Sequence, residues 1–288
     1  MHGIPRFLAG VLVLLAAATT AAEREVGAVY KNDQPQIDGV ADPLWDDIPA
    51  LEVLDPVAGV PLRLKAMYNG SRIFWLVTYP DQNESRLHKA YHWNADQGRY
   101  TLGPEREDTF VFKWAMQPDT LDLTLKAEHP YEADVWYWKA DRTDPVGYAD
   151  DKYQRYTRQP LDRSGELLSA SGRRFYLLRR GDTGRSSYEP RLPLDYEGDE
   201  LARYEHRVPR GSRADIIARG RWGDGRWVIE FSRRLVTGHD DDVQFDVSRR
   251  YRFGVSRFEI AGRAENPAID EPRFGSGEIG EHLILVFR

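Results

Sequence analysis

Apolar and polar residues alternate with a period of two along most of the chain, and no segment carries a convincing amphipathic helix of three turns. Short alternating runs rich in aromatic and β-branched residues predict strands. Asn69-Gly70 and the Gly223–Gly225 run add hairpin turns between neighbouring strands. The sequence therefore predicts an all-β protein, an antiparallel β-sandwich. The strands are expected at 62–68, 73–79, 109–114, 134–139, 214–222, 226–232, 251–258 and 282–287.

The middle of the chain breaks this pattern. Residues from about 140 to about 210 are polar, rich in Arg, Gly, Pro and Asp, and show little periodicity. A run of this length without strand or helix signals is usually functional or partly disordered. We expect long polar loops that lie over one end of a single sandwich domain spanning 23–288. A domain boundary in this run is the alternative.

The N-terminus reads as a secretory signal peptide over residues 1–22. A short segment with one arginine precedes an apolar run at 7–18, which is too short to span a bilayer. Thr20-Ala21-Ala22 offers small residues for cleavage before Glu23. An uncleaved anchor is the alternative. No later segment is apolar enough to cross a membrane, so we expect a periplasmic protein.

Composition narrows the chemistry. The chain has no cysteine, which excludes disulfides, cysteine-ligated metals and covalent c-type haem. Eight Trp, fifteen Tyr and eleven Phe supply a core without those crosslinks. A net charge of −6 gives a nucleic-acid role little support. No nucleophile elbow, P-loop or dinucleotide fingerprint is present, so catalysis by this chain is not expected.

The stretch from His129 to Tyr153 concentrates ring surface beside a potential iron ligand. A neutral imidazole is a good haem ligand, which makes His129 the best single candidate. Trp136 and Trp138 share one face of their strand, where they are positioned to wall a porphyrin. The alternatives are that His129 is an ordinary residue of the polar turn before Pro130, and that the two tryptophans pack in the core.

Met116 and Lys113 are further candidates for the same cofactor. Met116 offers a thioether two residues beyond Trp114, although a buried methionine more often fills a gap in the core. Lys113 lies between Phe112 and Trp114, and the alternative for it is a solvated strand face.

Two acidic runs are candidates for calcium, which prefers oxygen ligands. They are Asp150-Asp151 and Asp240-Asp241-Asp242. Neither has the spacing of an EF-hand loop, and acidic turns without an ion are the alternative.

Several motifs, in order, resemble a known family. Ile37–Trp45 resembles the opening of family-nine carbohydrate-binding sandwiches and of the haem-binding gamma subunits of ethylbenzene dehydrogenase and dimethylsulfide dehydrogenase. The second family is favoured by Lys65–Val77, by Asp134–Asp151 with its Trp-x-Trp-Lys-Ala strand and Pro-x-Gly-Tyr-Ala-Asp-Asp loop, and by Gly220–Arg233.

The resemblance implies one non-covalent b-type haem, between the two sheets or at their edge, held by Met and Lys. Here no Lys follows Lys152 and no Met follows Met116. Either the second ligand differs, or the iron is five-coordinate, or haem binding is lost. The expected function is periplasmic electron transfer with a redox partner or molybdenum oxidoreductase subunits. The alternative is a haem-free module that binds carbohydrate or another flat ligand.

Overall fold

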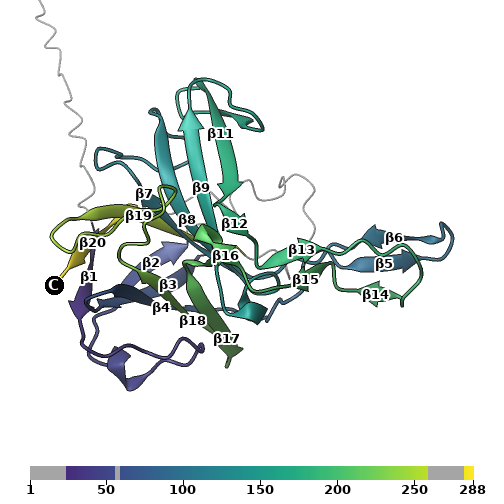
Figure 1. Ribbon diagram of the computed structural model, residues 1–288, viewed down its shortest axis with the longest axis horizontal. Helices are drawn as coiled ribbons and strands as arrows, with labels where there is room; N and C mark the ends of the chain where they lie inside the picture. The colour runs from purple at the N-terminus through teal and green to yellow at the C-terminus, as the bar shows by residue number, and fades with distance from the viewer. Residues whose placement is uncertain (1–23, 56–58, 259–281) are drawn as a thin grey trace, which may run out of the picture.

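The computed structural model describes residues 24–55, 59–258 and 282–288, and Figure 1 shows their arrangement. The predicted signal peptide lies outside these residues. The described residues form no α-helix and three single-turn 3-10 helices, η1 (Pro43–Trp45), η2 (Asp144–Val146) and η3 (Ser212–Ala214). No helix in the described ranges is long and apolar enough to cross a membrane.

Thirteen strands form one large sheet, in the order β10-β11-β9-β8-β7-β19-β20-β1-β3-β4-β18-β17, with β2 paired to β3. Their bounds are β1 (Arg24–Tyr30), β2 (Leu51–Asp55), β3 (Val60–Tyr68), β4 (Arg72–Pro80), β7 (Thr109–Ala115), β8 (Tyr131–Lys139), β9 (Asp150–Thr157), β10 (Gly165–Leu168), β11 (Arg174–Gly181), β17 (Ile217–Gly223), β18 (Arg226–Arg234), β19 (Tyr251–Phe258) and β20 (His282–Phe287).

The remaining strands are short and lie outside this sheet. Figure 1 shows most of them in an arm that projects from the sandwich, which we call the β5–β6 arm. It contains β5 (Tyr91–Asn94) and β6 (Arg99–Leu102), with β14 (Glu200–Leu201) paired to β5. At its base β13 (Tyr188–Pro190) pairs with β15 (Tyr204–His206). Closer to the sandwich, β12 (Gly184–Arg185) pairs with β16 (Arg210–Gly211).

The large sheet folds back on itself, so that two layers face each other. On one side the layers are joined through β20 and β1, and β1 pairs in parallel with both β20 and β3. All other pairs in the sheet are antiparallel. On the other side a bridge between Tyr148 and Ile217 brings the segment before β9 to β17. The predicted sandwich is therefore confirmed, with β1 as its parallel element.

Aromatic rings fill the space between the layers. Trp75 from one layer lies 4.8 Å from Phe112 and 5.4 Å from Phe253 of the other, between ring centroids. Trp138 and Trp227 meet across the layers at 4.9 Å. A second apolar cluster lies on the outer face of β7, β8 and β9, where the segment at 116–130 covers it. Burial of this aromatic surface supplies a core in a protein that has no disulfides.

All eight predicted strands are present, with small shifts of their ends. The turn between β17 and β18 has positive φ at both Asp224 and Gly225, as a tight hairpin requires. The segment at 140–210 differs from the expectation of loops. Much of it is strand, since β9, β10 and β11 extend the large sheet.

Candidate functional site

A cleft of about 650 Å³ lies between the segment at 116–130 and the exposed ends of β8 and β9. This volume is in the range of pockets that hold cofactors, roughly 300–1,000 Å³. Its walls carry the apolar groups Leu121, Pro130, Tyr131 and Tyr156, and the charged groups Asp119, Asp122, Glu132 and Arg155. The cleft is therefore a mixed surface, large enough for a flat ligand and open to solvent along one side.

His129 lines this cleft and is exposed. Its position is fixed by its neighbour Glu128, whose carboxylate accepts hydrogen bonds from the backbone N–H of Ser171 at 2.6 Å and from the hydroxyl of Ser169 at 3.1 Å. The bond from the Ser171 N–H lowers the pKa of Glu128. The turn between β10 and β11 thus anchors the chain next to His129. The imidazole itself makes no hydrogen bond or ion pair with any described residue.

Lys113 lies elsewhere, inside the outer apolar cluster of β7 and β8. Its side chain is fully buried, and its ammonium donates to the carbonyl of Leu123 at 2.7 Å and to the hydroxyl of Tyr131 at 2.8 Å. The expectation of a solvated strand face was wrong, because the segment at 116–130 covers this face of β7. Lys113 fastens that segment to the sheet.

Met116 follows β7 and is half-buried, with its backbone N–H donating to the carbonyl of Glu132 at 3.1 Å. It directly precedes Gln117, a residue of the cleft wall. Of the predicted ligands, His129 and Met116 therefore lie in or beside the segment that frames the cleft.

Trp136 and Trp138 are fully buried in the core between the layers. Trp136 packs 5.2 Å from Trp114, and the Trp138 indole N–H donates to a carboxylate oxygen of Asp144 at 2.9 Å. Successive side chains of a strand point to opposite faces. The tryptophans thus occupy the opposite face of the sheet from Lys113, whose neighbour across the strands is Val135. They do not wall the cleft that His129 lines, and the alternative of core packing holds for both.

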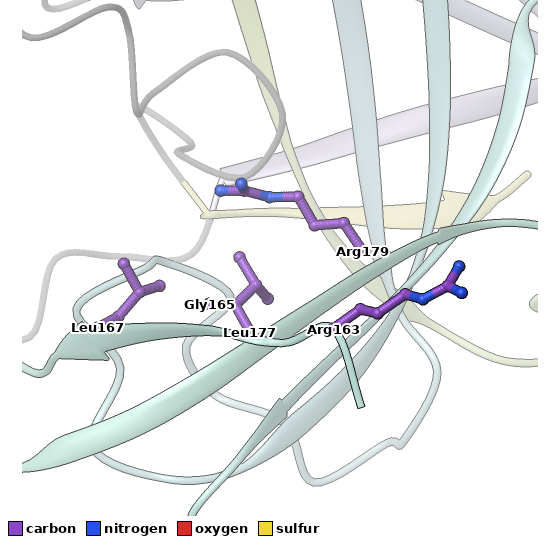
Figure 2. A pocket seen from close by; sticks show the side chains of 5 residues that line it. All are labelled: Arg163, Gly165, Leu167, Leu177 and Arg179. Carbon is purple, nitrogen blue, oxygen red and sulfur yellow. The ribbon is translucent and has the colours of Figure 1, made fainter. Parts of the chain in front are cut away.

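Figure 2 shows a second, smaller cavity of about 140 Å³ beside β10 and β11. It is lined by Arg163, Leu167, Leu177 and Arg179. Burial lowers the pKa of Arg179. The volume is well below that of a typical cofactor pocket.

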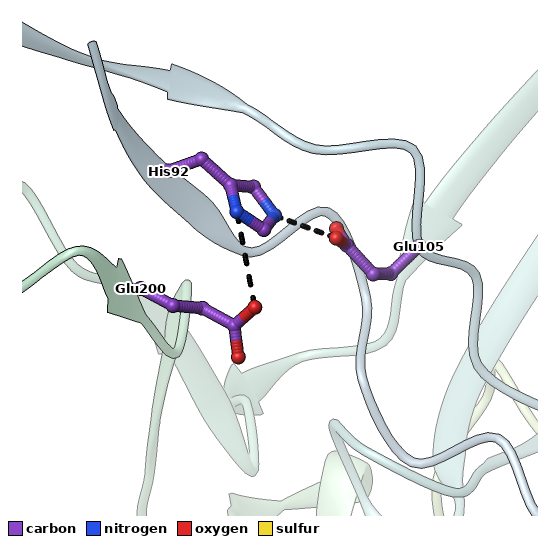
Figure 3. Close-up of side chains that lie close together, drawn as sticks. All are labelled: His92, Glu105 and Glu200. Carbon is purple, nitrogen blue, oxygen red and sulfur yellow. Dashed lines mark hydrogen bonds and ion pairs between the residues drawn. The ribbon is translucent and has the colours of Figure 1, made fainter.

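The β5–β6 arm carries a cluster of His92, Glu105 and Glu200, drawn in Figure 3. The two ring nitrogens of His92 lie 2.6 Å from Glu105 and 3.8 Å from Glu200. His92 of β5 thus shares a hydrogen bond with Glu105 and also faces the carboxylate of Glu200 on β14. Beside this cluster Trp93 packs edge-on against Tyr100 and Tyr196, with both centroid distances 5.1 Å. These three rings are at least partly exposed.

Asp150 and Asp151 are adjacent on β9, but their side chains lie in different surroundings. Burial alone would raise the pKa of Asp150, but the charges of Lys139, Lys152 and Arg213 outweigh it and hold that pKa far below its usual range. The ammonium of Lys139 and the guanidinium of Arg213 each lie 2.5 Å from its carboxylate. Asp150 is therefore neutralised by protein cations and is not available to an ion.

Asp151 points away from these cations, toward carboxylates contributed by other segments. Its oxygens lie within 4.8 Å of oxygens of Asp134 and Asp242. Asp242 also lies within 4.8 Å of Asp182 and Asp241. The two acidic runs singled out in the sequence thus converge on one buried cluster. Sequence reasoning missed Asp134 and Asp182, which carry no acidic-run signal.

The fold and the cleft define an all-β sandwich protein with a ligand-sized cleft at the end of one layer. The family model described as "Ethylbenzene dehydrogenase" matches residues 42–265. The chain belongs to this family. No curated protein matches the chain.

Similar solved structures include a carbohydrate binding module of family 9 from Caldicellulosiruptor kristjanssonii, in complex with cellotriose. It has a TM-score of 0.38 and 10% identity, and the similarity covers 92% of this chain and 95% of that one. The same module in complex with glucose gives a TM-score of 0.38, 9% identity, and coverage of 91% and 95%. Similarity at this level gives no information about ligands.

Proposed function

We propose that this protein is an exported, non-catalytic electron-transfer subunit that binds one b-type haem in the cleft lined by His129. The observation that carries the proposal is an exposed imidazole, without a hydrogen bond or ion pair to the part of the chain that the structure describes, in a cleft of about 650 Å³. Membership of the ethylbenzene dehydrogenase family supports a role beside the catalytic subunits of a molybdenum oxidoreductase. The bound haem would supply reversible one-electron transfer.

The residues that line the cleft include groups suited to binding a haem. Nε2 or Nδ1 of His129 is the iron ligand that this chain offers. Tyr131 and Tyr156 stack at 5.0 Å between centroids and form the apolar floor. Arg155 offers a guanidinium to a haem propionate, since guanidinium groups pair well with carboxylates. The space between the layers is filled by the aromatic core, which favours a haem at the edge of the sandwich.

This proposal leaves two alternatives for the second iron ligand. Met116, next to the cleft wall, would supply a thioether, or the iron would have no second protein ligand. Lys113 is held by Leu123 and Tyr131 in the outer apolar cluster and takes no part.

The proposal is tested by the visible spectrum of protein purified from the periplasm of a haem-replete host, followed by titration of the apoprotein with hemin. We expect a b-type Soret band, and at least a tenfold loss of hemin affinity in His129→Ala. His92→Ala is the matched control, because His92 is a partly exposed histidine on the β5–β6 arm, and it should bind hemin normally. Colourless protein that takes up no hemin would exclude the haem function. An unchanged spectrum in His129→Ala would remove His129 as the ligand.

A haem-free binding module is the second candidate, and the rings of Trp93, Tyr100 and Tyr196 on the β5–β6 arm favour it. Partly exposed aromatic rings are suited to stacking against a flat ligand. This candidate predicts glycan binding that is lost in Trp93→Ala, from protein that binds no hemin. The buried Trp138 is unsuited to this test, since its substitution would disturb the core.

A further inference from the structure

The buried carboxylate cluster is built from four segments that are distant in the sequence. Asp134 lies on β8, Asp151 on β9, Asp182 just after β11, and Asp242 between β18 and β19. Their exposed fractions are 0%, 0%, 6% and 4%. Charged side chains are rarely buried to this degree unless they are paired or bind a metal.

Within the described ranges, no group donates a hydrogen bond to most oxygens of this cluster. These are both oxygens of Asp151, Asp182 and Asp242 and one oxygen of Asp134. The other oxygen of Asp134 accepts a hydrogen bond from the backbone N–H of Val243 at 3.0 Å. A buried polar atom without a partner costs about 1–3 kcal/mol, and more when it is charged. Native proteins rarely concentrate so many such atoms in one place.

The positive charge beside the cluster is smaller than its negative charge. Arg233 is fully buried, and its Nη2 lies 3.4 Å from Asp134 and 3.2 Å from Asp242. His239, at the rim, approaches Asp242 at 3.8 Å but is bonded at 2.6 Å to Asp215. Of the residues placed in the structure, one guanidinium therefore faces four carboxylates.

Asp151 is the observation that points to a ligand. Its side chain is fully buried, neither oxygen accepts a hydrogen bond from an N–H or hydroxyl group of the described residues, and it lies close to Asp134 and Asp242. A side chain that served only the fold would be expected to bond to a backbone N–H or a cation, as its neighbour Asp150 does.

We propose that Asp134, Asp151 and Asp242 bind one Ca²⁺ ion, a site that is separate from the cleft of the proposed haem. Calcium takes six to eight oxygen ligands at about 2.3–2.6 Å, so two ligands on opposite sides of the ion lie about 4.8 Å apart. No distance between ligand oxygens within the trio Asp134, Asp151 and Asp242 exceeds 4.8 Å, whereas Asp182 groups with Asp241 and Asp242 and lies beside the trio. Magnesium binds its ligands at shorter distances and usually keeps several waters. A buried set of carboxylates is therefore less suited to magnesium than to calcium.

Neighbouring groups position this site. Asp241 is not a ligand in our assignment, because it accepts hydrogen bonds from the hydroxyl of Ser212 at 2.8 Å and from the N–H of Thr183 at 3.1 Å. These bonds hold the loop before Asp242 against the segment after Asp182. Arg233 stacks over Trp136 at 5.2 Å and closes the side toward the core. The ion would thereby join β8, β9 and the loop before β19.

The test uses the full chain and calcium itself. After equilibrium dialysis against buffer with 1 mM CaCl₂, elemental analysis should find about one calcium per chain in excess of the dialysate. Thermal unfolding in 1 mM CaCl₂ should occur about 5–10 °C above unfolding in EDTA, as expected for a ligand near 100 times its Kd. Equal MgCl₂ should shift the midpoint much less.

Variants distinguish the loss of calcium binding from the loss of the fold. Asp151→Asn and Asp242→Asn should lose both the bound calcium and the calcium-dependent shift, whereas Asp240→Asn, an exposed neighbour, should keep both. If Asp151→Asn and Asp242→Asn fail to fold, the unfolding of the wild type in CaCl₂ and in EDTA still shows whether the protein binds calcium. Absence of bound calcium, with equal thermal unfolding midpoints in CaCl₂ and EDTA, would overturn the proposal. The carboxylates would then be neutralised by shared protons. A stoichiometric ion other than calcium would overturn the assignment of the metal. Neither result depends on the Soret band.

Discussion

Lys113 shows how one buried cation organises a surface segment. Its ammonium bonds to Leu123 and Tyr131 and lies 4.6 Å from the centre of the Tyr131 ring. These contacts connect the middle of β7 to the segment that frames the cleft. A lysine at a position flanked by Phe112 and Trp114 thus connects the sheet to a surface segment.

Lys113→Met should destabilise the protein while leaving haem uptake intact. The substitution leaves the carbonyl of Leu123 unpaired in the apolar cluster, and we expect a loss of about 1–3 kcal/mol in the free energy of unfolding. Urea unfolding measures this loss, and hemin titration measures the cofactor site. Lys126→Met, in the same segment but exposed, should change neither. Loss of the Soret band in a folded Lys113→Met protein would contradict a structural role.

Local sequence could not reveal the environment of Lys113. Alternation along β7 indicates which residues share a face, but not what covers that face. The cover is the segment at 116–130, which has no strand pattern and whose contacts depend on Glu128 bonding to the β10–β11 turn. The same limit applies to Trp136 and Trp138, because core packing and cofactor binding both require apolar rings on one face.

At the scale of elements, the close approach of β17 to β8 is the tightest contact between the layers that we describe. The carboxylate of Asp144 accepts hydrogen bonds from the Trp138 indole at 2.9 Å and from the N–H of Gly220 at 2.6 Å. A Cβ at position 220 would lie 2.3 Å from Cζ2 of Trp138. Only glycine lets the strand lie directly on the indole.

Gly220→Ala should therefore force β17 away from Trp138. Overpacking of this kind costs about 1–3 kcal/mol, and we expect a loss of that size in the free energy of unfolding. Gly223→Ala is a control on the same strand, because a Cβ there meets nothing within 4 Å. Denaturant unfolding of both variants measures the difference. Equal stability of the two would show that the layers adjust without cost.

The sequence predicted the strands in which apolar residues dominate. It did not predict polar strands whose charged side chains are neutralised by residues far away in the sequence. β4 and β18 are rich in apolar residues and were found from sequence alone. β9 begins with Asp150, Asp151 and Lys152, which resembles a loop. Asp150 is compatible with a buried strand because Lys139 and Arg213 neutralise it, and Arg213 is far away in the sequence. The acidic runs were recognised as candidates for calcium, but their convergence depends on this unpredicted strand.

For the whole molecule, Glu230 links pH to stability. It is buried on β18 and accepts hydrogen bonds from the Trp45 indole at 3.0 Å and from the N–H groups of Gly39 at 3.1 Å and Asp38 at 3.2 Å. These bonds attach the N-terminal turn to the sheet. Burial raises the pKa of Glu230 from 4.5 to about 7, against the opposing effect of these hydrogen bonds.

The sign of the pH dependence follows from that shift. A carboxyl whose pKa is raised by folding binds its proton more tightly in the folded state. Its contribution to stability is therefore complete below about pH 4.5 and is lost as the pH rises through about 7. Between pH 5 and 8 the loss should be on the order of 2 kcal/mol, since one pKa unit corresponds to about 1.4 kcal/mol.

Glu230→Gln should remove this part of the pH dependence. Urea unfolding of the wild type and the variant across pH 5–8 gives the difference, in which contributions from other groups cancel. Exposed Glu205→Gln should follow the wild type. Parallel curves for the wild type and Glu230→Gln would mean that Glu230 keeps an ordinary pKa in the folded protein.

The parallel pairing of β1 with β20 has a consequence for biosynthesis. β1 is the first described strand to leave the ribosome, and the partner that connects it to the other layer is the last. Until β20 emerges, β19 and β1 present open edges, which are prone to pair with other chains. Contacts so distant in the sequence also form slowly. We therefore expect the nascent chain to depend on chaperones, and premature termination before β20 to yield aggregates rather than a shortened sandwich.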